Sequence, residues 1–299
     1  MKCKRCANNA VYTRKYSGES LCSSCFSDSI IRKTAKTISK HNMIKNRDNV
    51  CVAVSGGKDS LALLYVLNKM KESHNFEISP ITIDEGIPGY REEALKIVES
   101  FCSELDLKHQ VYSYKDLYDL TLEQALKEND RASSCSICGT LRRRAIDHAA
   151  KDVDASVIAT AHNLDDTLQT FLINMLSGDT KKVGWMDPDN VGDAKRKIKP
   201  FCEIYESEIV FFAFTNNLPF QTEPCPHMNE GIRTEIREFL NGLETNHTGI
   251  KNNLYQSIRK ISQVVNDSNN QSRSKCARCG SLCTGSTCSV CKMILSLRD

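Results

Sequence analysis

The chain has 299 residues, of which 40% are hydrophobic and 26% charged, with a formal net charge of +3 and 15 cysteines. This composition allows one sizeable core with small satellite modules, and it excludes a disordered chain, a collagen and a simple coiled coil. No stretch approaches the roughly 18–20 apolar residues of a membrane span, and the first residues lack the apolar run of a signal peptide. We therefore expect a soluble cytoplasmic protein with no membrane partner, whose paired cysteines bind metal rather than form disulfides.

The first module is predicted from two Cys-x2-Cys pairs. Cys3 and Cys6 are separated from Cys22 and Cys25 by fifteen residues, a spacing typical of a four-cysteine zinc site. Four thiolates complete the tetrahedral coordination of zinc, so this zinc is predicted to be structural. We place this zinc finger at residues 1–27.

A basic linker helix is predicted next, at residues 28–47. Ile31, Ala35 and Ile38 have helical spacing, and no acidic residue lies between Ser29 and Arg47. Its cations form either an RNA-facing surface or a solvated helix face.

From Asn49 the pattern becomes one of alternating strands and helices. Apolar runs predict strands at 50–54, 78–83 and 157–160, and helical periodicity predicts helices at 61–70, 92–105, 141–150 and 164–176. This alternation indicates a Rossmann-like α/β domain with a parallel sheet, which we place at residues 48–243, with its site at the carboxyl ends of the strands. Asp84, Gly86 and His162 fall just past predicted strand ends.

Residues 244–275 are predicted to contain a short amphipathic helix and then a polar linker from Asn266 to Lys275. Residues 276–299 form the second four-cysteine zinc finger. Its predicted ligands are Cys276, Cys279, Cys288 and Cys291, and Cys283 between the pairs is left unassigned.

A Gly-rich loop follows the first predicted strand, with the sequence Ser55-Gly56-Gly57-Lys58-Asp59-Ser60. Backbone N–H groups at such a strand-to-helix turn bind phosphate. The Walker A spacing is absent, and the hexapeptide instead resembles the PP-loop of ATP pyrophosphatases. That resemblance implies cleavage of ATP between the α and β phosphates, with Asp59 tied to catalysis or to magnesium.

Three more cysteines lie within the central domain. Cys135 and Cys138 form a CxxC pair before Gly139, and Cys225 stands far along the chain between two prolines. Three thiolates leave one position of a metal open. The spacing leaves three interpretations: a 4Fe-4S cluster, a redox pair that carries sulfur as a persulfide, and a third zinc.

In this order, the Gly-rich loop, the central cysteines and the terminal zinc modules resemble the tRNA 2-thiouridine synthetases of the PP-loop superfamily, over nearly the whole chain. The resemblance implies a 4Fe-4S cluster with one open iron, bound by Cys135, Cys138 and Cys225, and catalysis by these cysteines with Lys58 and Asp59. It also implies a site for ATP with magnesium, formed by Ala53, Ser55, Gly56, Gly57, Lys58, Asp59, Ser60, Ile83, Asp84, Arg142, Ala161 and Asp166.

The sequence departs from the family's pattern at one position in the segment 159–166. The family usually has glycine where this chain has Ala161, so a methyl group lies where the adenylate is expected. Gly139 to Arg143 have the Gly-x-x-Arg-Arg pattern of the wobble-uridine branch, whereas the T-loop branch tends to have lysine at Arg142. Three cations in the first turn of the predicted helix would oppose its dipole, which favours a bound polyanion.

A second basic cluster, Lys195 to Lys199, is predicted to be a loop that either contacts tRNA or is solvated. The function predicted is an ATP-dependent tRNA uridine 2-sulfurtransferase, which adenylates the C2 oxygen of the wobble uridine before sulfur replaces that oxygen. The alternatives are 2-thiolation of the T-loop 5-methyluridine and, from another class, a non-catalytic zinc-stabilised tRNA-binding scaffold. The resemblance further implies a homodimer, and a sulfur donor that is either free sulfide or a ubiquitin-like carrier protein. No role is assigned to His162 or His227.

Overall fold

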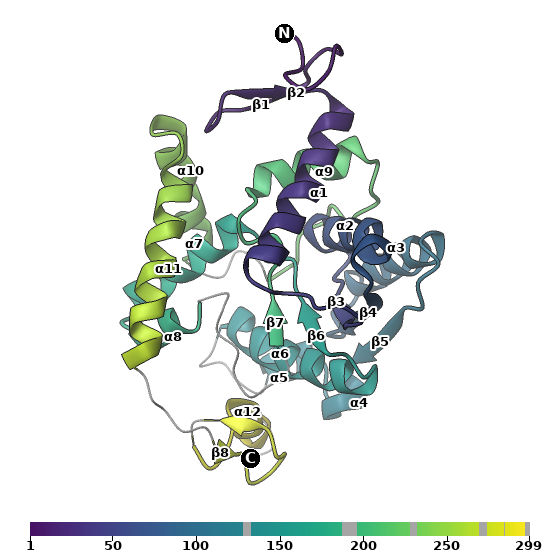
Figure 1. Cartoon of the computed structure of the whole chain (residues 1–299). Coiled ribbons are helices and arrows are strands. Elements are labelled where there is room, and N and C mark those ends of the chain that lie inside the picture. Colours follow the sequence, from purple (N-terminus) through teal and green to yellow (C-terminus); the bar gives the residue numbers. More distant parts are fainter. Residues whose placement is uncertain (128–132, 187–195, 228–231, 269–273, 284, 297–299) are drawn as a thin grey trace.

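The computed structural model describes all residues except 128–132, 187–195, 228–231, 269–273, 284 and 297–299. Within the described part, a parallel five-stranded sheet with the order β5-β4-β3-β6-β7 forms the centre of the molecule (Figure 1). Its strands are β3 (Asn49–Ala53), β4 (Glu77–Asp84), β5 (Gln110–Ser113), β6 (Val157–Ala159) and β7 (Arg196–Ile198).

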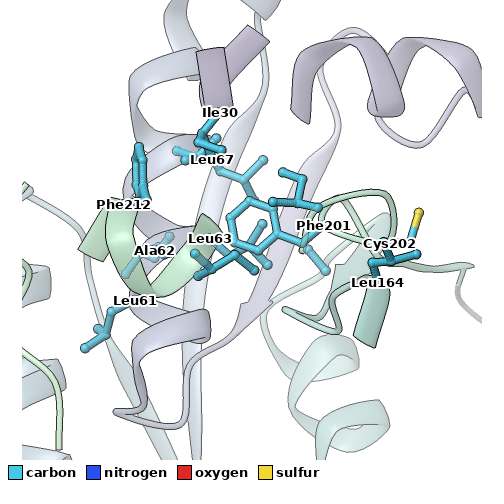
Figure 2. Close-up of a cluster of buried hydrophobic side chains, with 14 of the residues drawn as sticks. Ile30, Leu61, Ala62, Leu63, Leu67, Leu164, Phe201, Cys202 and Phe212 are labelled. Atoms are coloured by element: carbon cyan, nitrogen blue, oxygen red, sulfur yellow. The ribbon is translucent and has the colours of Figure 1, made fainter. Parts of the chain in front are cut away.

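The sheet is covered on both faces, as the apolar character of its strands requires. Successive side chains of β3 point to opposite faces, so Val50 and Val52 enter one hydrophobic cluster and Cys51 enters the other. The first cluster contains the buried faces of α2 (Lys58–His74), α3 (Arg91–Glu104) and α7 (Leu164–Leu176). Figure 2 shows Leu61, Leu63 and Leu67 of α2 in this cluster with Phe201 and Phe212.

The second cluster lies on the face that carries Cys51. It contains buried residues of α4 (Tyr114–Tyr118), α5 (Leu122–Lys127) and α6 (Ser134–Asp152). Leu141 and Ala145 of α6 pack there beside Ile81 and Ile158 of the sheet. The helices expected at 61–70, 92–105, 141–150 and 164–176 are all present, and α6 begins earlier than expected.

The N-terminal module is a short antiparallel hairpin, β1 (Tyr12–Arg14) and β2 (Glu19–Leu21), which leads directly into α1 (Ser23–Lys40). The predicted bounds of the linker helix, 28 and 47, were therefore wrong at both ends. The helix begins inside the cysteine module, because Cys22 is already its N-cap residue. It ends at Lys40, and Asn42 soon after adopts a left-handed backbone with φ 46°.

Buried charges attach this module to α9 (Glu206–Thr215). Arg14 Nε lies 2.5 Å from Glu208 Oε1, and Lys33 Nζ lies 3.3 Å from Glu208 Oε2. Lys40 pairs with Glu203. At least two cations of the basic segment, Lys33 and Lys40, are thus neutralised by carboxylates of the protein itself.

The predicted short helix after residue 243 is α11 (Ile250–Ser268), and a helix that was not predicted, α10 (Arg233–Asn246), precedes it. α10 packs against α7, and α11 packs against α7 and α8 (Thr180–Gly184), because α10 and α11 both have a strongly amphipathic pattern. Of the predicted linker, residues 266–268 belong to α11 and residues 269–273 lie outside the described part. The C-terminal module has β8 (Ser274–Lys275), β9 (Leu282–Cys283) and α12 (Ser289–Ser296), at the end of the molecule opposite the N-terminal module (Figure 1).

Two predictions about basic residues were wrong. Arg142 to Arg144 lie about two turns from the start of α6, so the helix dipole does not oppose their charges. Arg196 and Lys197 belong to β7 rather than to a loop, and they pair with Asp48 and Asp147; Lys195 lies outside the described residues. Among the described helices, none has the length and apolar character needed to cross a membrane.

Candidate active site

The order in which the chain adds strands to the parallel sheet reverses between β3 and β6. From β3 the chain continues to β4 and β5 on one side, whereas β6 and β7 lie on the other side. Loops diverge at such a switch point, and ligands of open parallel sheets bind there. A cleft of about 390 Å³ opens at this point, at the carboxyl ends of the strands. It is lined by Ala53, Val54, Ser55, Asp59, Ser60, Ile81, Ile83, Glu85, Arg142, Ile146, Thr160, Ala161, His162 and Asp166.

The Gly-rich loop joins β3 to α2 and is fixed by its own serines. Ser55 N–H donates to Ser60 Oγ at 3.1 Å, and Ser60 Oγ donates to Gly57 O at 2.9 Å. Gly56 has φ +87°, and a Cβ atom there would lie 2.8 Å from Ala94 Cβ. Only glycine combines this backbone with so close an approach. The loop therefore presents backbone N–H groups at the start of α2, where an anion is favoured.

Lys58 is not among the residues that line the cleft, and its ammonium group contacts two carboxylates. Its Nζ lies 2.8 Å from Asp59 Oδ2 and 2.9 Å from Glu206 Oε1. Burial raises the pKa of Asp59, and the positive charge of Lys58 opposes that shift. The side chain of Lys58 is thus held beside the loop by charges on α2 and α9.

The segment 159–166 provides the N-terminal cap of α7. Asn163 is the N-cap residue, and it exchanges hydrogen bonds with Asp166 in a capping box. Asn163 Nδ2 also donates to Asp59 Oδ1 at 3.4 Å, which connects this motif with the Gly-rich loop. Burial raises the pKa of Asp166 to about 6, and the nearby Asp59 adds to the shift.

Glu85 is a cleft residue that the sequence analysis missed. Its carboxylate lies between two guanidinium groups, 2.7 Å from Arg142 Nε and 3.0 Å from Arg91 Nε. The only sequence signal for it is its place two residues after the second predicted strand, and the sequence analysis assigned the preceding residue, Asp84, to the site instead. Asp84 accepts a hydrogen bond from Gly86 N–H at 2.8 Å and does not line the cleft.

The central CxxC pair lies in the first two turns of α6. Cys135 is exposed and Cys138 is buried, and spacing of three residues places them on one side of the helix. Arg142 Nη2 lies 3.1 Å from Cys138 Sγ, so the guanidinium that lines the cleft also contacts this thiol. Burial raises the pKa of Cys138, and the charge of Arg142 opposes the shift.

Cys225 is half-buried and lies on the segment that follows Gln221. Gln221 N–H donates to Gly56 O at 3.0 Å, so this segment is attached to the Gly-rich loop. Burial raises the pKa of Cys225, which also responds to the charges of Arg142 and Cys135. The three cysteines therefore share one neighbourhood beside the nucleotide cleft.

The two terminal cysteine groups have the geometry of single-ion sites. The four Sγ atoms of each lie within 4.8 Å of one another, as tetrahedral zinc requires, for which a Zn–S bond of about 2.3 Å gives S···S distances of about 3.8 Å. Their members are Cys3, Cys6, Cys22 and Cys25, and Cys276, Cys279, Cys288 and Cys291.

Among the described residues, the central three cysteines do not form such a tight group. Ligands that each bind a different iron of a cluster are farther apart than ligands of one ion. The donor set of three thiols in an apolar and cationic neighbourhood thus fits an iron–sulfur cluster with one iron free of protein ligands, better than a third zinc.

The structure brings most of the predicted nucleotide residues together at the cleft. Ala53, Ser55, Asp59, Ser60, Ile83, Arg142, Ala161 and Asp166 line it, whereas Gly56, Gly57, Lys58 and Asp84 do not. His162 also lines the cleft, and its Nδ1 lies 2.9 Å from Thr160 Oγ1. Desolvation in the cleft wall, followed by the positive charges of Lys199 and Arg233, lowers the pKa of His162.

Two protein families match this sequence. Residues 27–243 match the PP-loop domain, and residues 2–27 match the N-terminal LIM domain of the 2-thiouridine synthetase TtuA. The matched PP-loop region includes the cleft and all three central cysteines.

Curated relatives match along nearly the whole chain. A probable sulfurtransferase of Methanocaldococcus jannaschii is 33% identical over 98% of this chain and 87% of its own length. The cytoplasmic tRNA 2-thiolation protein 1 of Drosophila sechellia is 32% identical over 99% of this chain and 88% of its own length. Among solved structures, the U34-tRNA thiolase NcsA from Methanococcus maripaludis with its [4Fe-4S] cluster superposes with a TM-score of 0.85, at 30% identity over 98% of this chain and 95% of that one.

Proposed function

The chain belongs to the PP-loop family, among the tRNA 2-thiolation enzymes, and we propose that it uses ATP to convert the wobble uridine of tRNA to 2-thiouridine. One observation carries the proposal: the nucleotide cleft and the central cysteines meet at Arg142, which lines the cleft and lies 3.1 Å from Cys138 Sγ. An enzyme that activates a base with ATP and then replaces its oxygen by sulfur needs these two sites side by side. The Gly-x-x-Arg-Arg pattern from Gly139 and the name of the structural relative, a U34-tRNA thiolase, support the wobble position.

In the first step, the Gly-rich loop holds the phosphates of magnesium-bound ATP at the start of α2. The C2 oxygen of uridine attacks the α phosphorus, and the bond to the pyrophosphate group breaks. Backbone N–H groups and Lys58 stabilise the negative charge that pyrophosphate carries away. Asp59 lies at the same end of α2 and faces the cleft, where it would bind magnesium.

In the second step, sulfide attacks C2 of the adenylated base, the bond from C2 to oxygen breaks, and AMP leaves with the uridine oxygen. No electrons are gained or lost overall. We propose that Cys135, Cys138 and Cys225 hold a 4Fe-4S cluster, which supplies a Lewis-acidic iron without a protein ligand. The sulfur reaches the site as free sulfide or from the thiocarboxylate of a ubiquitin-like carrier protein.

Cations beside the cleft suit a polyanionic substrate. Lys199 and Arg233 act electrostatically on His162, and Arg142 and Arg143 on α6 add two more positive charges there. A positive field at the mouth of a site raises the local concentration of nucleic acid. We further propose zinc for the two terminal cysteine groups and, like the relative from Drosophila sechellia, action in the cytoplasm.

The test is anaerobic reconstitution of the protein with iron and sulfide, followed by reaction with ATP, sulfide and unmodified tRNA. Fragment mass spectrometry then locates any 2-thiouridine. Sulfur at the wobble position is expected, whereas sulfur in the T-loop would keep the chemistry and refute the position. Absence of both thiolation and pyrophosphate release, in protein that holds a cluster and binds tRNA, would favour a non-catalytic scaffold.

The assignment of the cysteines is tested by Cys225→Ala, with Cys102→Ala as the control. Cys102 is a buried thiol of α3 outside the cleft lining. Cys225→Ala is expected to abolish thiolation while it leaves MgATP binding intact, and Cys102→Ala is expected to keep both. Full thiolation by Cys225→Ala would rule out a role for this thiol.

A further inference from the structure

A chain of three charged side chains, Arg91, Glu85 and Arg142, lies in and behind the wall of the cleft. Glu85 stands at its centre with only 4% of its side chain exposed, between the guanidinium groups of Arg91 and Arg142. A buried carboxylate with two cations is costly to desolvate, so this arrangement is weak evidence for added stability, and what it does show is which groups the carboxylate joins.

Arg91 anchors one end of this chain. Its Nη1 donates to Ser55 O at 3.0 Å, and its Nη2 donates to Ile83 O at 2.7 Å. Both acceptors are backbone atoms at the carboxyl ends of neighbouring strands. The side of Glu85 that faces Arg91 is therefore fixed to the rigid sheet and to the beginning of the Gly-rich loop.

Arg142 forms the other end and is less constrained by packing. About 46% of its side chain is exposed, and a long arginine side chain loses considerable rotamer freedom when it is held in one position. Its Nε contacts Glu85 and its Nη2 contacts Cys138 Sγ. The planar guanidinium thus contacts the carboxylate through Nε and the thiol through Nη2. The single ammonium group of a lysine cannot reproduce this pair of contacts.

We propose that Glu85 is a positioning residue, which holds the Arg142 guanidinium between the nucleotide cleft and the central cysteine Cys138. This inference rests on the function proposed above. It assigns to Glu85 no contact with the reacting atoms, since Glu85 acts through Arg142. The carboxylate of Glu85 thereby links α6, through Arg142, to the sheet and the Gly-rich loop, through Arg91.

The test compares Glu85→Gln with Glu208→Gln. Glu208 is an equally buried carboxylate between two cations, Arg14 and Lys33, but it lies in the contact with the N-terminal module. Glu85→Gln is expected to weaken MgATP binding to the cluster-free protein and to reduce the thiolation rate, each by roughly 10- to 100-fold, the range for loss of one charge-assisted hydrogen bond. Glu208→Gln is expected to lose a similar amount of stability but to keep wild-type MgATP binding and thiolation.

A double-mutant cycle with Arg142→Ala separates positioning from a general structural effect. If Glu85 acts through Arg142, the double variant Glu85→Gln with Arg142→Ala is no slower than Arg142→Ala alone. Effects that multiply would overturn the proposal, as would wild-type MgATP affinity and rate in Glu85→Gln.

Should Glu85→Gln fail to fold, Arg142→Lys provides the test, because this half-exposed position tolerates a change of side chain. Lysine keeps the charge and cannot contact Glu85 and Cys138 together, so full activity in this variant would also refute the proposal. If the wild type binds MgATP but forms no 2-thiouridine, the function proposed above fails. The MgATP comparison between Glu85→Gln and Glu208→Gln would still decide the role of Glu85.

Discussion

Gly56→Ala is the most direct test of the Gly-rich loop as the structure describes it. An alanine at φ +87° adopts a left-handed backbone, at a cost of about 1–2 kcal/mol, of which the stiffer unfolded chain returns about 0.4–1 kcal/mol. The new methyl group would also lie 2.8 Å from Ala94 Cβ and close to the backbone of α3. Such overpacking against a helix adds about 1–3 kcal/mol. We expect a total loss of about 2–4 kcal/mol in the free energy of unfolding.

Gly178→Ala is the matched control. Gly178 has φ +70°, but a Cβ atom there meets nothing within 4 Å, so this variant carries the backbone cost without the collision. Urea denaturation of both metal-loaded variants gives the difference, and calorimetric titration with MgATP shows whether the loop has moved. We expect Gly56→Ala to be less stable than Gly178→Ala and to bind MgATP at least tenfold more weakly. Equal stability of the two variants, with unchanged MgATP affinity, would refute the close contact with Ala94.

Three further predictions concern single residues. Burial raises the pKa of Asp166 to about 6 in the folded protein, above its unfolded value, so its ionisation removes stability as the pH rises from about 4 to 6. Asp166→Asn should therefore gain about 1–2 kcal/mol relative to wild type at pH 7 and nothing at pH 4, after allowance for partial exposure, and a pH-independent difference by denaturation would contradict this. Lys251→Met leaves the buried carboxylate of Asp165 without its ammonium partner, and urea denaturation should show a loss of about 3–5 kcal/mol; a loss below 1 kcal/mol would show that Asp165 is satisfied by its other contacts. Cys276→Ser should lower the zinc content from two ions to one per chain by elemental analysis, and an unchanged content would remove this thiol from the ligand set.

Local sequence signals predicted the strands β3, β4 and β6 and the helices α2, α3, α6 and α7, and the family resemblance supplied most of the cleft lining. The Gly-rich loop and the segment 159–166 each follow a short apolar strand, and parallel strands bring their carboxyl ends to one edge of a sheet. That rule brings the Gly-rich loop and His162 to one cleft, and the family resemblance added Asp166. Cysteine spacing likewise predicted both terminal groups, because ligands of one ion must be close in space.

The features that sequence reasoning missed depend on contacts between distant segments. Glu85 follows a strand like many acidic residues, and nothing local shows that Arg91 and Arg142 meet it from two other helices. The strand β7 has only three residues, Arg196–Ile198, which is too short for a clear strand pattern. The sequence analysis therefore assigned its two cations to a loop, because their partners Asp48 and Asp147 lie far away in the chain. Helix α10 did have a local signal that the sequence analysis overlooked, because Ile236, Leu240 and Leu243 have helical spacing.

The two terminal cysteine modules are attached to helices that also carry site residues. On α9, Glu206 pairs with Lys58 of the Gly-rich loop, while Glu208 holds Arg14 of the N-terminal module. On α6, the surface around Cys138 faces the cleft, while Arg144 Nη2 lies 2.6 Å from Cys279 Sγ of the C-terminal module. Residues two positions apart on a helix point to different neighbours, so α9 contacts the N-terminal module through Glu208 and the Gly-rich loop through Glu206. Each module is thus joined to a helix that also carries a residue near the site, Glu206 on α9 and Cys138 on α6.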